Sequence, residues 1–281
     1  MSDARRGFET KLTRHDSENF APDDPPAGVL RLVKYDSPSG SLAAYVSLAP
    51  ADGKKHPAII WLVGGFSNSI SEYSWLPAKP SNDQSARAFR EAGVITMYPS
   101  LRGGNNNPGY KERFFGEVDD ALAAARFLAK QDGVDPNAIY LGGHSTGGTL
   151  ALLCAEMPNP FRAVFSFGPV RDVRSYGTKD APFDASDLHE VVPRSPAYWL
   201  DSIQVPTFIF VGTKKPSNLG ELRAIRAKTT NPQVHCLEIK GATHFSTLAP
   251  ATALIARKII AADAGKTDVS FDQGELDRLV Q

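Results

Sequence analysis

The sequence has 281 residues, a length that a single α/β domain can occupy, and it carries 31 Lys and Arg against 31 Asp and Glu. With a net charge of zero and no window that concentrates basic residues, the chain offers no charged surface for nucleic acid or for an anionic membrane. No run approaches the roughly 18 apolar residues of a membrane span, and the first residues lack the apolar core of a secretory signal, so we expect a cytoplasmic protein.

The first 27 residues combine charge with three prolines and show no apolar period, which is typical of an arm outside the core. The domain then begins near Gly28. Two alternating stretches, Val29–Tyr35 and Leu42–Leu48, flank a Ser-Pro-Ser-Gly turn, and this pattern predicts an antiparallel hairpin.

Short and almost uniformly apolar segments then alternate with segments of helical period. Runs without alternation are typical of strands buried on both faces, so the pattern predicts an α/β fold: a mostly parallel central sheet with helices on both faces. The expected strands are Ala58–Val63, Val94–Tyr98, Ala138–Gly142, Ala163–Phe167, Thr207–Val211 and Val234–Ile239. The expected helices are Gln84–Ala92, Glu117–Lys130, Thr146–Met157, Leu219–Lys228 and Pro250–Ala262.

Two segments interrupt this rhythm. Residues 171–202 are rich in proline and aromatic residues and show no clear strand, which is typical of an insertion or lid that forms a pocket wall. Residues 263–281 are polar with a few apolar residues at helical spacing, and both a docked helix and a frayed end fit that pattern. We therefore divide the chain into an arm (1–27), an α/β domain (28–262) and a C-terminal tail (263–281).

The strongest chemical signal is Gly143-His144-Ser145-Thr146-Gly147, which follows an expected strand and runs directly into an expected helix. A serine on such a tight turn has a strained backbone that requires small neighbours, and its hydroxyl projects above the sheet. Ser145 is therefore the candidate nucleophile of an acyl-transfer reaction. The N-terminus of the helix presents free backbone N–H groups, so the amide of Thr146 is a candidate donor to an oxyanion.

A second oxyanion donor is expected in the loop after the strand that ends at Val63. That loop reads Gly64-Gly65-Phe66, and glycines allow the backbone to approach a substrate closely. The amide of Gly65 is the candidate, or that of Phe66 if the register differs by one residue.

A general base is expected after the nucleophile in this topology. Three histidines, His189, His235 and His244, follow Ser145. Only His244 occupies a loop between the last expected strand and the last expected helix, so it is the candidate base. His144 precedes the serine and is expected to be a packing or hydrogen-bonding neighbour.

Five short segments extend this pattern along the chain. They are Pro99-Ser100-Leu101-Arg102-Gly103-Gly104, Gly116-Glu117-Val118-Asp119-Asp120, Val134-Asp135-Pro136-Asn137, Gly142-Gly143-His144-Ser145-Thr146-Gly147-Gly148 and Gly168-Pro169-Val170-Arg171-Asp172. In this order, over roughly residues 57–262, they resemble the catalytic domain of the prolyl oligopeptidase family of α/β-hydrolases. The resemblance implies an α/β-hydrolase fold, a Ser–Asp–His triad and no cofactor. The chain is too short for the N-terminal propeller of the larger peptidases in that family, so we do not expect selection of oligopeptides by length. A chain with two cysteines offers no thiolate zinc site, and we expect no metal.

The sequence departs from the family at the triad acid. The family has an aspartate a few residues beyond the strand that corresponds to Thr207–Val211, whereas this chain reads Gly212-Thr213-Lys214-Lys215-Pro216-Ser217-Asn218. Asp172, beyond the end of the preceding strand, is the first candidate to replace it, although the resemblance gives that position a structural role. Glu221, near the start of the following helix, is the second candidate, and an absent acid is the third alternative.

The sequence thus predicts a serine hydrolase, an esterase or peptidase that cleaves an ester or a short peptide or amide bond through an acyl-enzyme on Ser145. Its expected partner is a small-molecule ester or a short peptide, and the sequence predicts no oligomeric state. The alternative is a catalytically impaired hydrolase-fold binding protein that lacks a proper triad acid.

Overall fold

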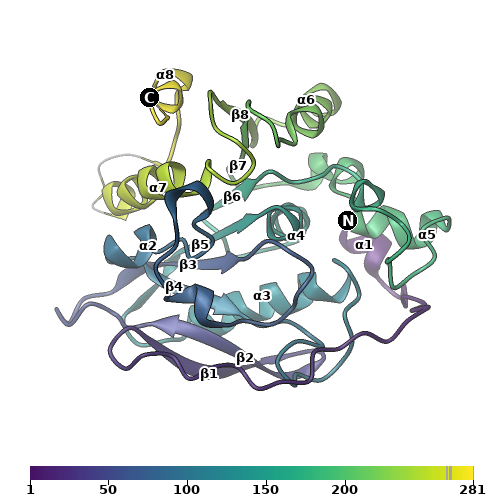
Figure 1. The fold of residues 1–281 in the computed structure, drawn as a ribbon, viewed down its shortest axis with the longest axis horizontal. Coiled ribbons are helices and arrows are strands. Elements are labelled where there is room, and N and C mark those ends of the chain that lie inside the picture. The colour runs from purple at the N-terminus through teal and green to yellow at the C-terminus, as the bar shows by residue number, and fades with distance from the viewer. Residues whose placement is uncertain (264, 266–267, 281) are drawn as a thin grey trace.

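The computed structural model describes residues 1–263, 265 and 268–280, and within them eight strands form one sheet in the order β1-β2-β4-β3-β5-β6-β7-β8 (Figure 1). The strand β2 pairs antiparallel with β1 and with β4, and every other neighbouring pair is parallel. The mostly parallel sheet predicted from the apolar runs is confirmed. The strands are β1 (Leu30–Ser37), β2 (Gly40–Ser47), β3 (His56–Leu62), β4 (Ile95–Pro99), β5 (Val134–His144), β6 (Ala163–Phe167), β7 (Thr207–Gly212) and β8 (Val234–Ile239).

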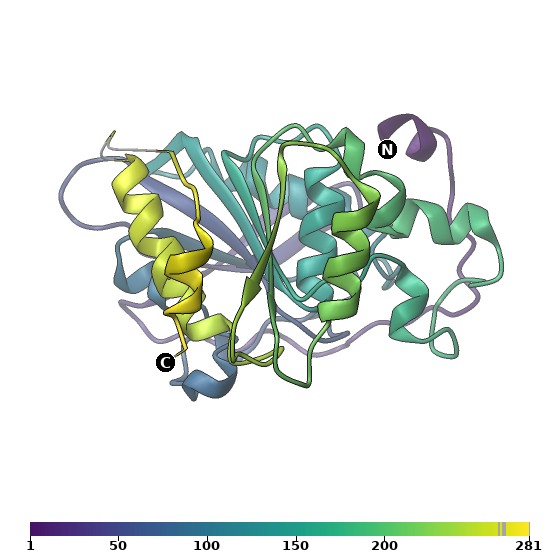
Figure 2. The ribbon, with the colours of Figure 1, turned by 90° about the horizontal axis from the view of Figure 1, so that it is seen from above.

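Helices cover both faces of the sheet, which explains why the central strands are apolar at every position. All residues of β4, β6 and β7 are buried. One hydrophobic cluster joins the sheet to α3, α4 and α6, and a second cluster joins its other face to α2, α7 and α8. Figure 2 shows the yellow-green α7 on one side of the sheet and the green α6 on the other. The main helices are α2 (Ala88–Glu91), α3 (Gly116–Leu128), α4 (Thr146–Ala155), α6 (Leu219–Lys228), α7 (Leu248–Asp263) and α8 (Gln273–Asp277).

The helix expected over Gln84–Ala92 is much shorter in the structure, where α2 begins at Ala88. Its expected first turn is irregular because Ala86 has φ 46° and because the Gln84 carbonyl accepts a hydrogen bond from the indole N–H of Trp61 at 2.9 Å. The Gln84 side chain contacts His144, so this segment packs against the residue that precedes Ser145 and does not extend the helix.

The insertion at 171–202 contains no strand among its described residues. Its one α-helix is α5 (Leu188–Val191). Its 3-10 turns are η3 (Val173–Tyr176), η4 (Val192–Arg194), η5 (Pro196–Tyr198) and η6 (Leu200–Ser202). Two further 3-10 turns, η1 (Glu72–Ser74) and η2 (Pro80–Asn82), lie between β3 and α2.

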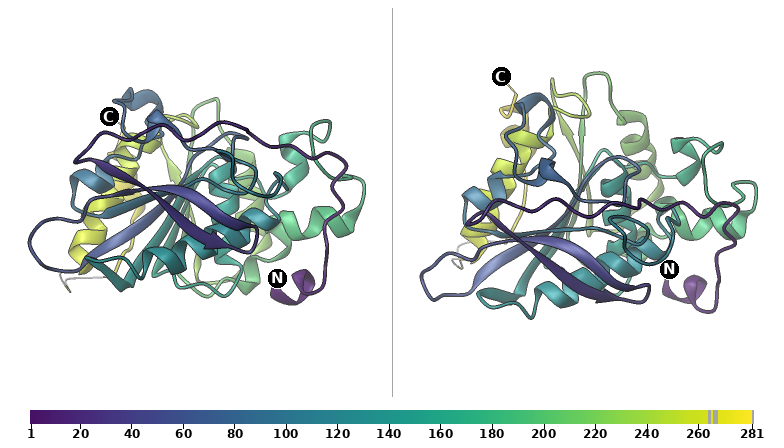
Figure 3. Two further views of the ribbon diagram at one scale, coloured as in Figure 1. Left: turned by 90° about the horizontal axis from the view of Figure 1, so that it is seen from below. Right: turned by 60° about the horizontal axis from the view of Figure 1, so that its bottom comes forward.

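The N-terminal arm, which starts with α1 (Ser2–Arg5), lies along the insertion and then crosses the molecule to the hairpin (Figure 3). Glu190 of the insertion accepts hydrogen bonds from the Thr10 hydroxyl and the Lys11 amide. Leu12 forms a β-bridge with Phe183. These contacts place residues 10–12 against the insertion, while Ser2 at the start of the arm contacts Met157, just beyond the end of α4.

The C-terminal tail ends in α8, which packs against β8 and buries Leu276 completely. Positions 264, 266–267 and 281 of the tail lie outside the described residues. Across the described residues, none of the helices combines the length and apolar character needed to cross a membrane.

Candidate active site

Ser145 lies between β5 and α4 in a backbone conformation with φ 55° and ψ −113°. The glycines two positions before and two positions after it, Gly143 and Gly147, are required because a larger side chain would clash with neighbouring backbone. A Cβ atom at Gly143 would lie 2.3 Å from the Gly147 carbonyl oxygen, and one at Gly147 would lie 2.1 Å from the Leu62 carbonyl oxygen. The tight turn expected from the sequence is therefore present, with its glycines in the expected role, and Ser145 stands at the N-terminus of α4.

The loop after β3 lies directly against this turn. A Cβ atom at Gly64 would come within 3.3 Å of the Ser145 Cβ, and the Thr146 hydroxyl donates a hydrogen bond to the Gly65 carbonyl. Gly65 has φ 105°, a conformation that favours glycine. The first N–H groups of α4, including that of Thr146, have no partner within the helix. Gly65 and Thr146 are thus adjacent, and their role as oxyanion donors stays a prediction.

His244 is held in the loop between β8 and α7 by its backbone. Its N–H donates to the Pro216 carbonyl at 2.6 Å, and its carbonyl accepts from His144 Nε2 at 2.9 Å. Its ring packs on Gly168, where a Cβ would lie 2.6 Å from both Nδ1 and Cε1. The preceding residue, Phe167, accepts the Ser145 N–H at 2.7 Å. The backbone of Ser145 and the ring of His244 therefore contact neighbouring residues of the dipeptide Phe167–Gly168, at the carboxyl end of β6.

His144 is a hydrogen-bonding neighbour of the site, as expected from its position before the serine. Its Nδ1 contacts the Gln84 side chain at 2.9 Å, and its ring centre lies 4.6 Å from that of His244. Burial, with a contribution from His244, lowers the pKa of His144 to about 3. His144 is therefore neutral and fixes the loop of His244 through its Nε2–H.

The structure does not bring Asp172 to His244. The Asp172 carboxylate caps η3 by accepting the Arg174 N–H at 2.9 Å, and it forms an ion pair with the Arg174 guanidinium at 2.6 Å. These hydrogen bonds, led by that of the Arg174 side chain, lower the pKa of Asp172. The expected contact with the imidazole is absent because the carboxylate is occupied within its own turn.

Glu221 is also committed elsewhere, because it accepts the Arg171 N–H at 3.0 Å and the Ser175 hydroxyl at 3.3 Å. The loop after β7 supplies Asn218, whose side chain donates to the Gly168 carbonyl at 2.7 Å. The Nδ1 atom of His244 is buried and has no hydrogen-bond partner among the described residues. The arrangement is thus a serine and a histidine without an orienting carboxylate.

A cavity of about 260 Å³ opens beside Thr146 and Gly65. Its walls come from the arm, β3 and the loop after it, the loop between β4 and α3 with the start of α3, the start of α4 and the insertion. The apolar part includes Trp61, Leu62, Ile70, Leu101, Phe114 and Leu150.

Two polar residues of this cavity were not singled out by the sequence. The Tyr176 hydroxyl lies 2.8 Å from the Thr149 hydroxyl, while burial raises the pKa of Tyr176 well above its ordinary value. Glu117 is 3% exposed and lines the same cavity. In the sequence, Glu117 is a first-turn acid, a position that the helix dipole alone explains. No group of three or more His, Cys, Asp or Glu side chains in the described part of the chain is placed to hold a metal ion.

Residues 80–214 match the model of the prolyl oligopeptidase family, Peptidase_S9. The dipeptidyl-peptidase 5 of Porphyromonas endodontalis is 28% identical over 163 residues, which are 52% of this chain and 21% of that protein. The chain spans a third or less of the length of the curated relatives it matches.

Solved structures share the fold. A puromycin-hydrolyzing peptidase of Mycobacterium tuberculosis has a TM-score of 0.66 at 18% identity, and the match covers 88% of this chain and 42% of that one. An esterase of Pyrobaculum calidifontis has a TM-score of 0.60 at 20% identity, with 85% and 87% covered. These matches and the family model confirm the α/β-hydrolase resemblance that the ordered motifs predicted.

Proposed function

This chain has an α/β-hydrolase fold and resembles the catalytic domain of the prolyl oligopeptidase family, and we therefore propose that it is a serine hydrolase. We propose that it cleaves an ester or a short peptide or amide bond through an acyl-enzyme on Ser145. The observation that carries the proposal is the position of Ser145. It stands at φ 55° on a glycine-flanked turn, at a helix N-terminus, beside the loop that holds His244.

The first half-reaction forms a bond between Ser145 Oγ and the substrate carbonyl carbon while His244 accepts the serine proton. The amides of Thr146 and Gly65 stabilise the negative charge on the carbonyl oxygen. The bond to the leaving group then breaks, and His244 returns the proton to the leaving oxygen or nitrogen. Water repeats these steps on the acyl-enzyme, releases the acid and restores Ser145.

The test uses an active-site probe and a simple ester. The unmodified protein should react with a fluorophosphonate probe in a 1:1 ratio and hydrolyse p-nitrophenyl butyrate. Ser145→Ala should lose all labelling and most turnover, and Ser166→Ala is the matched control, because Ser166 is a buried serine of β6. Undiminished labelling of Ser145→Ala would refute the assignment.

A second candidate function is favoured by the buried Nδ1 of His244, which has no hydrogen-bond partner in the described part of the chain. Loss of a triad aspartate can reduce the rate about 10⁴-fold, so a chain without a replacement would bind ligands and turn over few of them. Reversible binding of an ester with neither a burst nor turnover would support this binding protein. Turnover that is stoichiometrically blocked at Ser145 would exclude it.

Within the first proposal, compact acyl substrates are favoured because the cavity beside Thr146 holds only about 260 Å³. A panel of aminoacyl-naphthylamides and short-chain esters tests this preference. A higher kcat/KM for the amides would make the protein a peptidase rather than an esterase.

A further inference from the structure

One glutamine side chain is connected to the loop of the predicted base through His144. The Gln84 Nε2 atom lies 2.9 Å from His144 Nδ1, and His144 Nε2 lies 2.9 Å from the His244 carbonyl oxygen. The ring of His144 is 1% exposed, so neither of its nitrogens exchanges these partners freely with bulk water. Two hydrogen bonds therefore link the Gln84 amide to the backbone of His244.

The direction of both hydrogen bonds follows from the groups at their ends. A carbonyl oxygen accepts and never donates, so His144 Nε2 must carry the proton that binds the His244 carbonyl. Burial, with a contribution from His244, lowers the pKa of His144 to about 3, so the ring is neutral and its Nδ1 is an acceptor. The amide nitrogen of Gln84 supplies the donor, and it lies closer to Nδ1 than the amide oxygen, which is at 3.2 Å. Gln84 thus favours the one tautomer of His144 that can hold the His244 loop.

The Gln84 amide is itself held in this orientation. Its second N–H donates to the Asn82 side-chain oxygen at 2.8 Å, and its oxygen faces the Gly64 N–H at 3.5 Å. Its backbone carbonyl accepts the indole N–H of Trp61. Ala86, two residues later, has φ 46°, a conformation that residues with a side chain rarely adopt, and such strain is concentrated at functional sites. The segment adopts an unfavourable backbone and presents the amide to His144.

The position of His244 depends on its backbone contacts. Its ring lacks the partner that a triad aspartate provides, because Nδ1 is buried with no hydrogen-bond partner among the described residues. Its N–H donates to the Pro216 carbonyl, and its carbonyl also accepts the Thr247 hydroxyl at 3.2 Å. Neither of these groups adjoins the nucleophile, whereas His144 ends β5 and directly precedes Ser145. The bond from His144 is thus the contact that relates the base loop to the serine.

We propose that Gln84 is a positioning residue for acyl transfer: its amide N–H binds His144 and thereby holds the His244 loop beside Ser145. This inference rests on the proposed serine hydrolase function, because it assumes that His244 acts as the base. A triad aspartate orients the ring of the base, whereas here a neutral amide–imidazole pair orients its backbone.

Gln84→Met tests this role, because methionine has a similar length and no amide. With p-nitrophenyl butyrate, kcat should fall about tenfold, less than the roughly 100-fold that a displacement of about 1 Å causes, because the Pro216 bond remains. KM should stay within about twofold, since Gln84 is not among the residues that line the cavity beside Thr146. Gln131→Met is the matched control, because the Gln131 amide also makes two hydrogen bonds and precedes the amino end of β5. Equal kcat values of the two variants would refute the proposal.

A double-mutant cycle shows whether Gln84 acts through His144. His144→Phe removes the bond to the His244 carbonyl, so its kcat should fall at least as far as that of Gln84→Met. Addition of Gln84→Met to His144→Phe should change kcat by less than about twofold, since both substitutions break the same connection. Effects that multiply in the double variant would show that Gln84 does not act through His144.

An NMR measurement keeps the proposal testable if a variant does not fold or if no ester is hydrolysed. With isotope-labelled histidine in the unmodified protein, the His144 ring should carry its proton on Nε2, and a proton on Nδ1 would refute the bond from Gln84. The ring signals of His244 should shift in Gln84→Met and not in Gln131→Met. Unchanged His244 signals in both variants would refute the coupling even in an active enzyme. The expected signals without ester turnover or probe labelling would refute only the hydrolase function.

Discussion

Glycine 168 determines where the candidate base can lie, because the His244 ring packs against the position of its missing side chain. Gly168 has φ 55° and lies at the end of β6, next to the residue that binds the Ser145 amide. A side chain here would therefore act on the site without touching Ser145.

We expect Gly168→Ala to reduce kcat by about 100-fold, the loss that a displacement of roughly 1 Å causes in a catalytic group. The new Cβ would lie 2.6 Å from His244 Nδ1, so the ring must move. Gly53→Ala is the control, since Gly53 has φ 71° and nothing within 4 Å of an added Cβ. Both variants should lose about 1–2 kcal/mol of stability from backbone strain. Equal activity of the two variants would contradict the prediction.

The contacts of Asp172 predict a small effect for Asp172→Asn. Because its carboxylate binds Arg174 and not His244, kcat should stay within about threefold, and the lost ion pair should cost at most about 1 kcal/mol of stability. A fall in kcat approaching 10⁴-fold would return the orienting role to Asp172. Glu221→Gln, measured beside it with p-nitrophenyl butyrate, tests the other candidate in the same way.

The pH dependence of kcat/KM should report His244 alone. Burial lowers the pKa of His244 below its ordinary value of about 6.5, and the base must be neutral, so the rate should be full above pH 6.5 and fall as pH decreases through the lowered pKa. His144, with a pKa of about 3, stays neutral throughout. A profile from pH 4.5 to 8 checks this, and an acid limb centred above pH 7 would contradict it.

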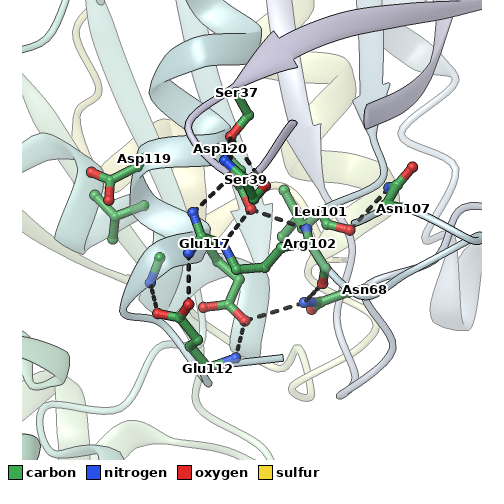
Figure 4. A network of polar contacts seen from close by, with 12 residues as sticks. Ser37, Ser39, Asn68, Leu101, Arg102, Asn107, Glu112, Glu117, Asp119 and Asp120 are labelled. Atoms are coloured by element: carbon green, nitrogen blue, oxygen red, sulfur yellow. Dashed lines mark hydrogen bonds and ion pairs between the residues drawn. The ribbon is translucent and has the colours of Figure 1, made fainter. Parts of the chain in front are cut away.

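At the scale of residues, the sequence could predict what short-range sterics require. Ser145 needs glycines two positions before and two positions after it, and the five residues from Gly143 to Gly147 already show this requirement in the sequence. The orienting acid could not be predicted, because the path of the loop after β6 decides whether Asp172 contacts Arg174 or His244, and this path is not visible in the sequence. Glu117 could not be distinguished from a solvated first-turn acid, since its partners, Asn68 and Glu112, come from the loop after β3 and the loop before α3 (Figure 4).

The N-terminal arm is the element whose contribution the sequence understated. Glu18 accepts hydrogen bonds from the Asn68 and Ser69 amides at 3.1 and 3.0 Å and from the Ser69 hydroxyl, so it holds the loop that supplies a predicted oxyanion donor. Burial raises the pKa of Glu18, but bonds from Ser69 and Lys111 outweigh it and leave this pKa lowered.

We expect Glu18→Ala to lower kcat/KM about tenfold, because the loop at 64–70 loses its anchor, while the sheet stays folded. Glu9→Ala is the matched control, since Glu9 is an exposed carboxylate on the same arm. Circular dichroism and hydrolysis of p-nitrophenyl butyrate check both points. An equal effect of the two substitutions would contradict the role of Glu18.

Among the elements, strands were predicted well and loops were not. A strand buried on both faces is recorded in its own residues, as in Ala163–Phe167, where the expected and observed bounds agree. The helix expected over Gln84–Ala92 failed because distant groups, Trp61 and His144, bind Gln84 and prevent its first turn. The arm showed no apolar period because its attachments, such as Thr10 to Glu190 and Phe8 to Phe115, are made one residue at a time.

Across the whole molecule, the sheet and its two helical layers place the ends of β3, β5 and β6 at one edge, and the site lies there. The cavity beside it is assembled from five segments that are far apart in sequence. The prediction of a parallel sheet already indicates that a site lies at the edge formed by the carboxyl ends of its strands. The shape of the cavity follows only from how those segments pack together.

The attachment of the arm has a consequence for the order of folding. The hydrogen bond between Thr10 and Glu190 joins residues 180 positions apart, and Arg194 binds Thr10 across 184 positions. Contacts of such long range form late, because closing the chain costs entropy before they can stabilise it. After dilution from denaturant, ester hydrolysis should therefore recover more slowly than the circular dichroism of the sheet. Simultaneous recovery of both signals would show that the arm docks as the sheet forms. Later recovery of hydrolysis would show that the cavity beside Thr146 is completed only at the end of folding.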